Sequence, residues 1–216
     1  MRFTKDEIRK AMLLYAVTDS SWLKEGQTLA EVVEDVLANG ATFLQIREKE
    51  MEHGAFLAEA RQLQAAAAAH RVPFVVNDAI DIALELDADG VHVGQSDIVG
   101  AMIGPDKILG ISANTVETAV AAQAAGADYI GVGAVFPTST KKDAKSLSRE
   151  EMRAICEAVD IPVVAIGGIN AGNLPQLAGS GVDGVAVGSA IFAQPDPGAA
   201  TRHLLELAGT MVASHG

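Results

Sequence analysis

Several features that define common classes of protein are missing from this 216-residue sequence. It has one cysteine, Cys156, which excludes an internal disulfide and any metal site built from paired cysteines. Cys156 falls in a predicted amphipathic helix over residues 148–159, so we expect a small buried apolar side chain rather than a nucleophile. Aromatic residues make up 4% of the chain, and the apolar content is mostly Ala, Val, Ile and Leu, as expected where helices pack on buried strands.

A signal peptide and a membrane span are also missing. The opening residues, MRFTKDEIRK, contain no apolar core, and no apolar run approaches the roughly 20 residues that cross a bilayer. Acidic residues outnumber basic ones, 28 to 16, and the net charge of -12 argues against nucleic acid and anionic membranes as partners. We therefore expect a cytoplasmic protein that acts on small molecules. The oligomeric state stays open, with a homo-oligomer as one option.

What recurs along the chain is a short β-branched run followed by a segment of helical period. No proline- or serine-rich linker interrupts this alternation, which predicts one domain over residues 1–216. The eight predicted strands cover residues 13–19, 41–48, 73–78, 90–94, 107–113, 127–136, 162–169 and 184–192. Three helix starts have capping-box spacing and two helix ends have a suitable glycine: Thr4 with Glu7, Asn114 with Glu117, Ser148 with Glu151, Gly40 and Gly126.

Eight strands alternating with helices, after a short leading helix near residues 4–12, fit either a doubly wound open sheet or a (β/α)8 barrel. No G-x-G-x-x-G pattern follows the first strand, which weakens the dinucleotide-binding alternative. The count of eight favours an α/β fold of the TIM-barrel type. In such a barrel, functional side chains collect at the C-terminal ends of the strands.

The second strand, which continues as FLQIREKE, alternates between two kinds of side chain. One face carries Leu44, Ile46 and Glu48, and the other carries Phe43, Gln45, Arg47 and Lys49. The apolar first face would pack under helices, so the second face should point into the barrel mouth. Arg47 and Lys49 are costly to desolvate there unless an anion pairs with them. A salt-bridged pair that lines the lumen is the alternative.

Two carboxylates follow the third and fourth strands, Asp78 after Asn77 and Asp97 in GVHVGQSD. Because neighbouring strands lie about 4.8 Å apart, these carboxylates can reach a common point. Such a sparse oxygen site suits Mg²⁺ rather than zinc. Spacing alone leaves helix caps equally open, since Asp also favours that position. We expect His92, on the same strand, to be a hydrogen-bonded core histidine.

The remaining strand ends carry hydroxyls, glycines and one further lysine. These are Ser112 after the fifth strand, Thr138, Ser139, Thr140 and Lys141 after the sixth, Gly167 and Gly168 after the seventh, and Gly188 and Ser189 after the eighth. Hydroxyls and backbone N–H groups can wrap a phosphate, and a lysine supplies charge. Together with the second strand and the carboxylates, they predict a Mg²⁺-dependent barrel enzyme that handles a diphosphate and a phosphate. They do not identify the substrate.

These residues resemble the thiamine-phosphate synthase family over nearly the whole chain. The resemblance rests on QIREK (45–49), VNDAIDIAL (76–84), ADGVHVGQSD (88–97), ILGISA (108–113), ADYIGVGAVFPTSTKKDA (127–144) and IPVVAIGGI (161–169). It implies a (β/α)8 barrel that joins 4-amino-2-methyl-5-(diphosphooxymethyl)pyrimidine to 4-methyl-5-(2-phosphooxyethyl)thiazole, giving thiamine phosphate and pyrophosphate. It also implies that the bond to diphosphate breaks before the thiazole nitrogen attacks.

The resemblance further implies a role for each matching residue. The pyrimidine diphosphate would be bound by Gln45, Arg47, Lys49, Asn77, Ser112 and Lys141, of which Arg47, Lys49, Ser112 and Lys141 would act in catalysis. The thiazole phosphate would be bound by Thr138, Ser139, Thr140, Gly168, Gly188 and Ser189. The Mg²⁺ cofactor would be bound by Asp78 and Asp97.

Three rival functions remain at this point. A thiazole tautomerase would share the barrel, but such relatives of the synthases depart at the P-T-x-T-K loop, which is present here. A non-catalytic phosphate-binding barrel would not need the two carboxylates. A sugar-phosphate isomerase would need a carboxylate or cysteine base, and the sequence places none well.

Overall fold

The computed structural model describes residues 3–48, 51–95, 103–104, 106–137 and 146–214. Its strands pair in parallel and in chain order, and β8 pairs with β1 to close a barrel. The strands are β1 (Leu14–Val17), β2 (Phe43–Ile46), β3 (Phe74–Asn77), β4 (Gly90–Val93), β5 (Ile108–Ser112), β6 (Tyr129–Val132), β7 (Val163–Ile166) and β8 (Gly184–Val187). The predicted (β/α)8 barrel is confirmed.

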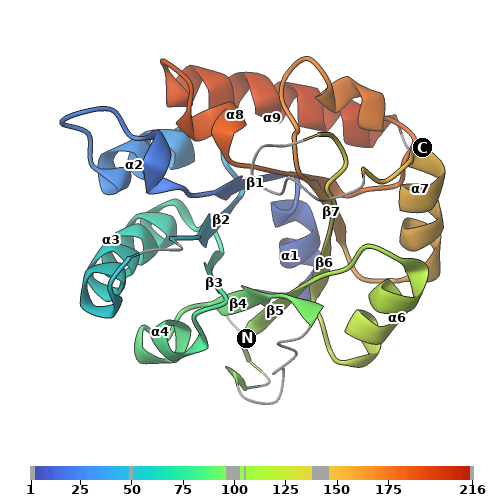
Figure 1. Cartoon of the computed structure of the whole chain (residues 1–216), viewed down its shortest axis with the longest axis horizontal. Coiled ribbons are helices and arrows are strands. Elements are labelled where there is room, and N and C mark those ends of the chain that lie inside the picture. The colour runs from blue at the N-terminus through green and yellow to red at the C-terminus, as the bar shows by residue number, and fades with distance from the viewer. Residues whose placement is uncertain (1–2, 49–50, 96–102, 105, 138–145, 215–216) are drawn as a thin grey trace.

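Helices surround the strands on the outside of the barrel (Figure 1). They are α2 (Leu29–Ala38), α3 (His53–His70), α4 (Ile80–Glu85), α6 (Val116–Ala124), α7 (Arg149–Ala158), α8 (Ser189–Phe192) and α9 (Pro197–Ala213). The predicted leading helix is α1 (Lys5–Ala11), and two 3-10 turns are η1 (Ser20–Trp22) and η3 (Leu174–Leu177).

Two predictions near the end of the chain are wrong. The segment between β7 and β8 forms the short turn η3 rather than a full helix, because Gly179 and Gly181, with φ values of +74° and +88°, follow it directly. The eighth strand ends at Val187 instead of residue 192, because the chain turns at Gly188, whose carbonyl accepts hydrogen bonds from Ile191 and Phe192.

The predicted helix starts are confirmed at two of three places. Thr4 with Glu7 and Ser148 with Glu151 form complete capping boxes at α1 and α7. At α6 the prediction is wrong by one residue, since the box is formed by Thr115 and Thr118. Asn114 is used elsewhere: its side-chain Oδ1 accepts a hydrogen bond of 3.2 Å from the backbone N–H of Gly133.

Alternation along each strand separates two apolar cores. One face packs under the helices, as Leu44 and Ile46 do, and these positions are fully buried. The other face fills the barrel lumen, where Tyr15, Phe43 and Tyr129 gather with apolar residues of α1. Helix α1 therefore closes the N-terminal end of the barrel and leaves its C-terminal end to the functional residues.

A hydrogen bond of one kind recurs four times at this closed end. The residue just before each even-numbered strand uses a side-chain oxygen to accept the backbone N–H at the start of the preceding strand. The pairs are Thr42 with Leu14 (2.8 Å), Asp89 with Phe74 (3.0 Å), Asp128 with Leu109 (2.9 Å) and Asp183 with Val163 (2.8 Å). These bonds satisfy N–H groups that would otherwise be unpaired at the strand starts.

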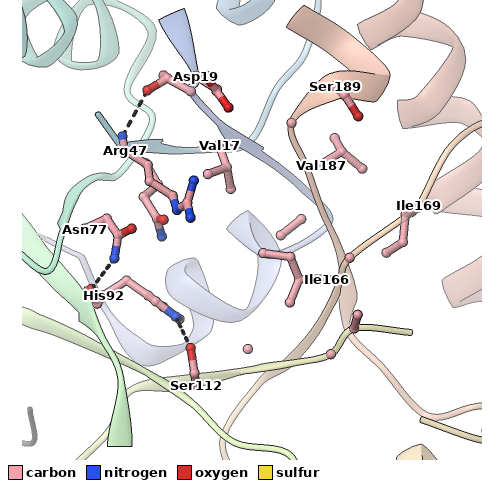
Figure 2. Close-up of a pocket in the computed structure, with 18 of the residues that line it drawn as sticks. Val17, Asp19, Arg47, Asn77, His92, Ser112, Ile166, Ile169, Val187 and Ser189 are labelled. Carbon is pink, nitrogen blue, oxygen red and sulfur yellow. Dashed lines mark hydrogen bonds between the residues drawn. The ribbon is translucent and has the colours of Figure 1, made fainter. Parts of the chain in front are cut away.

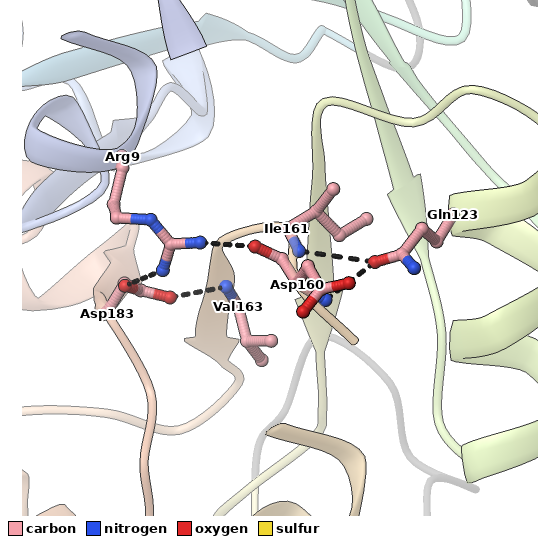
Figure 3. Close-up of polar contacts among 6 residues, drawn as sticks. All are labelled: Arg9, Gln123, Asp160, Ile161, Val163 and Asp183. Carbon is pink, nitrogen blue, oxygen red and sulfur yellow. Dashed lines mark hydrogen bonds and ion pairs between the residues drawn. The ribbon is translucent and has the colours of Figure 1, made fainter. Parts of the chain in front are cut away.

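Side chains from two helices extend this pattern (Figure 3). Arg9 of α1 donates to Asp183 Oδ1 and to the carbonyl of Asp160, both at 2.5 Å. Gln123 of α6 accepts from the backbone N–H groups of Asp160 and Ile161, at 2.7 and 3.3 Å. These polar contacts stabilise the closed end of the barrel.

No helix among the described residues has the length and apolar character that a membrane crossing requires.

Candidate active site

A cavity of about 340 Å³ opens at the C-terminal ends of the strands, and each of the eight strands contributes to its wall. The wall has two halves (Figure 2). Most of the polar and charged side chains come from the β2 to β5 side, namely Gln45, Arg47, Asn77, Asp78, His92, Ser112 and Asn114, while Thr18, Asp19 and Ser189 add polar groups after β1 and β8. Apolar side chains come from β1, β7 and β8, and they include Val17, Ile166, Ile169 and Val187. Such a site can hold a charged group on one side and an apolar ring on the other.

Arg47 extends from the end of β2 into this cavity (Figure 2), as the alternation predicts. Its backbone N–H donates to Thr18 Oγ1 at 3.0 Å, which fixes the chain where the strand ends. Within the described ranges, no carboxylate lies within salt-bridge distance of the Arg47 guanidinium, although Arg9, Arg61 and Arg153 each have one. The alternative of a salt-bridged lumen arginine is therefore not seen there, and Arg47 can bind an anion.

Asn77 and Asp78 turn the chain sharply at the end of β3. Asn77 Nδ2 donates to the His92 carbonyl at 3.2 Å, and the Asp78 N–H donates to the same oxygen at 3.0 Å. Asp78 adopts a φ of +57°, a left-handed conformation that Asp tolerates better than most residues. Its exposed carboxylate lines the cavity.

Of the two alternatives left open for Asp78, the structure excludes the helix cap. Helix α4 begins after Ala79, and no side-chain hydrogen bond caps it, so Asp78 is not a helix cap. A carboxylate held at the cavity wall is the donor type that a hard divalent cation prefers. No group of three potential metal-ligating side chains occurs in the described part of the chain. Asp97, the other carboxylate expected in a Mg²⁺ site, lies outside the described residues.

The glycines after β7 have a structural reason that the sequence did not reveal. Gly167 and Gly168 both have positive φ values, +98° and +69°. A Cβ at Gly168 would lie 2.5 Å from the carbonyl oxygen of Pro137. Gly168 therefore lets the segment after β6 pass over the end of β7, and it also lines the cavity. Gly188 and Ser189 line the cavity at the start of α8.

Six predicted residues lie outside the described residues, so their roles stay predictions: Lys49, Asp97, Thr138, Ser139, Thr140 and Lys141. The other eight, Gln45, Arg47, Asn77, Asp78, Ser112, Gly168, Gly188 and Ser189, line one cavity.

Sequence reasoning missed part of the cavity wall. Trp22 and Ile166 are 39% and 36% exposed, which is unusual for large apolar side chains, and both line the cavity. In the sequence, the sign that they line the cavity was their position, after β1 for Trp22 and at the end of β7 for Ile166. His92 also lines the cavity while it makes the hydrogen bonds expected of a core histidine, to Tyr129 and Ser112, both at 3.0 Å.

Cys156 lies on α7 and does not line the cavity. Burial, and to a lesser degree the charge of Asp183, raises the pKa of the Cys156 thiol to about 12. The thiol therefore stays protonated near neutral pH, which fits the expectation of a structural side chain.

Fold and cavity together define a class: a TIM-barrel enzyme whose open end presents an arginine beside an apolar wall. The sequence model of the thiamine monophosphate synthase family matches residues 14–191, and the chain belongs to this family. A thiamine-phosphate synthase of Ruminiclostridium cellulolyticum is 50% identical over 198 residues, which cover 90% of this chain and 94% of the relative. One of Clostridioides difficile is 48% identical over 196 residues, which cover 89% and 93%.

A solved structure supports the same family assignment. Thiamine phosphate pyrophosphorylase from Pyrococcus furiosus has a TM-score of 0.86 and 38% identity, covering 94% of this chain and 98% of that one. The family expected from the sequence is confirmed, and so is the class of enzyme, a transferase of thiamine biosynthesis.

Proposed function

We propose that this chain joins 4-amino-2-methyl-5-(diphosphooxymethyl)pyrimidine to 4-methyl-5-(2-phosphooxyethyl)thiazole and releases pyrophosphate. The observation that carries the proposal is the divided cavity, with Arg47 in its polar half and no carboxylate partner for it among the described residues. A diphosphate supplies the missing negative charge. The relatives named above, thiamine-phosphate synthases, support the same reaction.

In this proposal, the polar half of the cavity binds the pyrimidine diphosphate. The Arg47 guanidinium lies where negative charge develops as the carbon–oxygen bond to diphosphate breaks, and it stabilises that charge. Asn77, anchored on the His92 carbonyl, and Ser112, anchored on the His92 ring, orient the same substrate. Lys49 and Lys141 are proposed to add charge at the diphosphate.

The apolar half would hold the thiazole. Val17, Ile166 and Val187 line it, and together they exclude water from the carbon that the thiazole nitrogen attacks. No general base is needed, because the attacking nitrogen carries no proton. The thiazole phosphate would be held by Gly168, Gly188 and Ser189 with Thr138, Ser139 and Thr140, so that both reactants are oriented before the bond forms.

Mg²⁺ is proposed as the cofactor, bound by Asp78 and Asp97. When bound, it would neutralise charge on the diphosphate leaving group. The exposed Asp78 carboxylate, which caps no helix, fits this role.

The test is an assay with both substrates and a Mg²⁺ titration, in which thiamine phosphate and pyrophosphate are both measured. Asp78→Ala should raise the Mg²⁺ concentration for half-maximal rate by roughly tenfold or more, because a ligand is lost. Asp81→Ala is the matched control, since Asp81 is an exposed carboxylate on α4 that faces His53 rather than the cavity. Folded wild-type protein that forms neither product would refute the reaction, and an unchanged Mg²⁺ response in Asp78→Ala would refute the metal site.

We also propose that the enzyme works in the cytoplasm on these small molecules and without a nucleic-acid or membrane partner. The net charge of -12 supports this part of the proposal.

A further inference from the structure

A continuous chain of hydrogen bonds crosses the barrel lumen beneath the cavity. Gln45 Nε2 donates to the Tyr15 hydroxyl, and that hydroxyl contacts the Tyr129 hydroxyl at 2.8 Å. Tyr129 contacts His92 Nδ1 at 3.0 Å, and His92 Nε2 contacts Ser112 Oγ at 3.0 Å. The chain thus joins strands β2, β1, β6, β4 and β5, and both of its end residues line the cavity.

Two glycines inside strands make room for this chain. A Cβ at Gly110 would lie 2.2 Å from Cζ of Tyr129, so no larger residue fits there while the tyrosine keeps its position. A Cβ at Gly131 would lie 3.1 Å from Cε1 of His92. Glycine weakens a strand interior, and it occurs where another group must approach closely. The sequence therefore accommodates the two rings at some cost in strand stability.

The direction of the hydrogen bonds follows from the number of protons available. An amide nitrogen cannot accept, so Tyr15 accepts from Gln45. Tyr15 is buried, and among the described residues Tyr129 is the other partner of its hydroxyl, so the arrangement that leaves no buried O–H proton unpaired has Tyr15 donating to Tyr129. Tyr129 then donates to His92 Nδ1, which leaves the imidazole proton on Nε2. His92 donates that proton to Ser112 Oγ.

This order decides what the two ends present to the cavity. The Ser112 hydroxyl accepts from His92, and its own proton has no acceptor within the described ranges, so it is available to a ligand. Gln45 donates its side-chain N–H to Tyr15 beneath the cavity and keeps its side-chain carbonyl oxygen as an acceptor for a ligand. An aminopyrimidine edge, with an amino donor and a ring-nitrogen acceptor, complements this pair.

We propose that Tyr129 is a positioning residue that holds His92 in one tautomer and so orients Ser112 toward the aminopyrimidine, while Tyr15 holds Gln45 at the other end of the chain. This inference rests on the proposed synthase reaction. Tyr129 touches no substrate, because it is fully buried and does not line the cavity. It acts on Ser112 through His92.

The test is a double-mutant cycle on kcat/KM for the pyrimidine substrate. Tyr129→Phe keeps the ring beside Gly110 and removes the hydroxyl, and we expect a loss of roughly tenfold, the worth of one hydrogen bond. In the Ser112→Ala background, the same change should cost less than about twofold, because the group through which it acts is gone. KM for the thiazole phosphate should not change.

Tyr15→Phe is the matched control, since it removes an equivalent hydroxyl from the same lumen but leaves the bond between Tyr129 and His92 in place. Its effect should add to that of Ser112→Ala. Additive losses for Tyr129→Phe, or an equal rise in KM for the thiazole phosphate, would overturn the inference. If instead the wild-type protein formed no thiamine phosphate, the proposed reaction would fail, while the tautomer of His92 would be decided by spectra of the protein without substrates.

A measurement on the wild-type protein without substrates tests the tautomer and does not depend on activity. Long-range ¹H–¹⁵N spectra at pH 8 should show His92 protonated at Nε2 and unprotonated at Nδ1. The chain has five histidines, and His92→Gln identifies the signal by removing it. A His92 signal with the proton on Nδ1 would overturn the inference whether or not the tyrosine variants fold.

Discussion

At the scale of single residues, Arg47 is the one half-buried arginine among the described residues, where the other arginines are exposed. Arg9 pairs with Asp183, Arg61 with Glu85 and Arg153 with Glu157. Arg47 is half-buried beside a cavity, and no carboxylate within the described ranges balances its charge. An unpaired charge costs free energy when it loses water, so a ligand that supplies the opposite charge gains from the contact.

Removal of the Arg47 charge should therefore impair the reaction far more than the fold. We expect Arg47→Ala to lower kcat by about 10²- to 10³-fold, the usual effect of losing one group that stabilises charge in a transition state. Arg61→Ala is the control, because Arg61 is 61% exposed and pairs on the surface with Glu85. Steady-state kinetics and thermal melting of both variants check this. Equal rates in the two variants would contradict the role of Arg47.

The sequence made Arg47 predictable, since alternation along one strand is a local property. The lumen contacts were not predictable in this way. Tyr15 and Tyr129 are 114 positions apart, and no local pattern shows that their hydroxyls meet across the barrel. Gly168 was predicted as a ligand contact, and the carbonyl of Pro137 also leaves no room there for a Cβ, a contact that only the folded chain reveals.

At the scale of elements, the connection from β1 to α2 is tied to the end of β2 by one carboxylate. Glu48 accepts from Thr18 Oγ1 at 2.9 Å and from Ser20 Oγ at 2.6 Å, and Thr18 Oγ1 in turn accepts from the Arg47 N–H. Thr18 is fully buried. The loop and the strand thus hold each other, and Arg47 lies at the junction.

A change at Glu48 should loosen this junction. In Glu48→Gln, one acceptor oxygen becomes an NH₂ group that faces the hydroxyl and N–H donors of Thr18 and Ser20. We expect KM for the pyrimidine diphosphate to rise several-fold and the unfolding free energy to fall by about 1 kcal/mol. Glu25→Gln, an exposed change in the same connection, should alter neither quantity. Kinetics and urea denaturation check this, and a normal KM in Glu48→Gln would show that the junction does not position Arg47.

Helix starts show how far element boundaries follow from sequence. Thr4 with Glu7 forms the predicted capping box, in which each side chain accepts from the backbone N–H of the other residue. Asn114 has the same local spacing, but its side chain accepts from the backbone N–H of Gly133, just after β6, and Thr115 caps the helix instead. The tertiary contact of Asn114 thus determines which of two neighbouring residues caps α6. A local sequence pattern does not contain that contact.

At the scale of the whole molecule, the two ends of the barrel have different tasks. The C-terminal end holds the cavity, and the N-terminal end is closed by α1 and by side-chain acceptors at the strand starts. Changes at the closed end should therefore alter stability without altering the chemistry. Asp128 and Asp183 make the same kind of bond but differ in electrostatic surroundings, so they allow a comparison.

Burial raises the pKa of Asp128, and this effect outweighs the hydrogen bond from the Leu109 N–H, which lowers it. A raised folded-state pKa means that the stability contributed by Asp128 is fully present below its unfolded pKa, about 3.9, and is lost as pH rises through the folded value. Asn keeps an acceptor for Leu109 without a charge. Asp128→Asn should therefore be at least as stable as the wild type at pH 7, with no advantage near pH 4.

Asp183→Asn should behave in the opposite way at pH 7. Asp183 accepts from Val163 with one oxygen and from Arg9 with the other, so an amide loses one of the two bonds. We expect a loss of about 1 kcal/mol at pH 7, with kcat unchanged because the cavity lies at the other end of the barrel. Urea unfolding of both variants at pH 4 and pH 7 measures the contrast. Asp128→Asn would contradict the electrostatic account if it were less stable than the wild type at pH 7 by as much as Asp183→Asn.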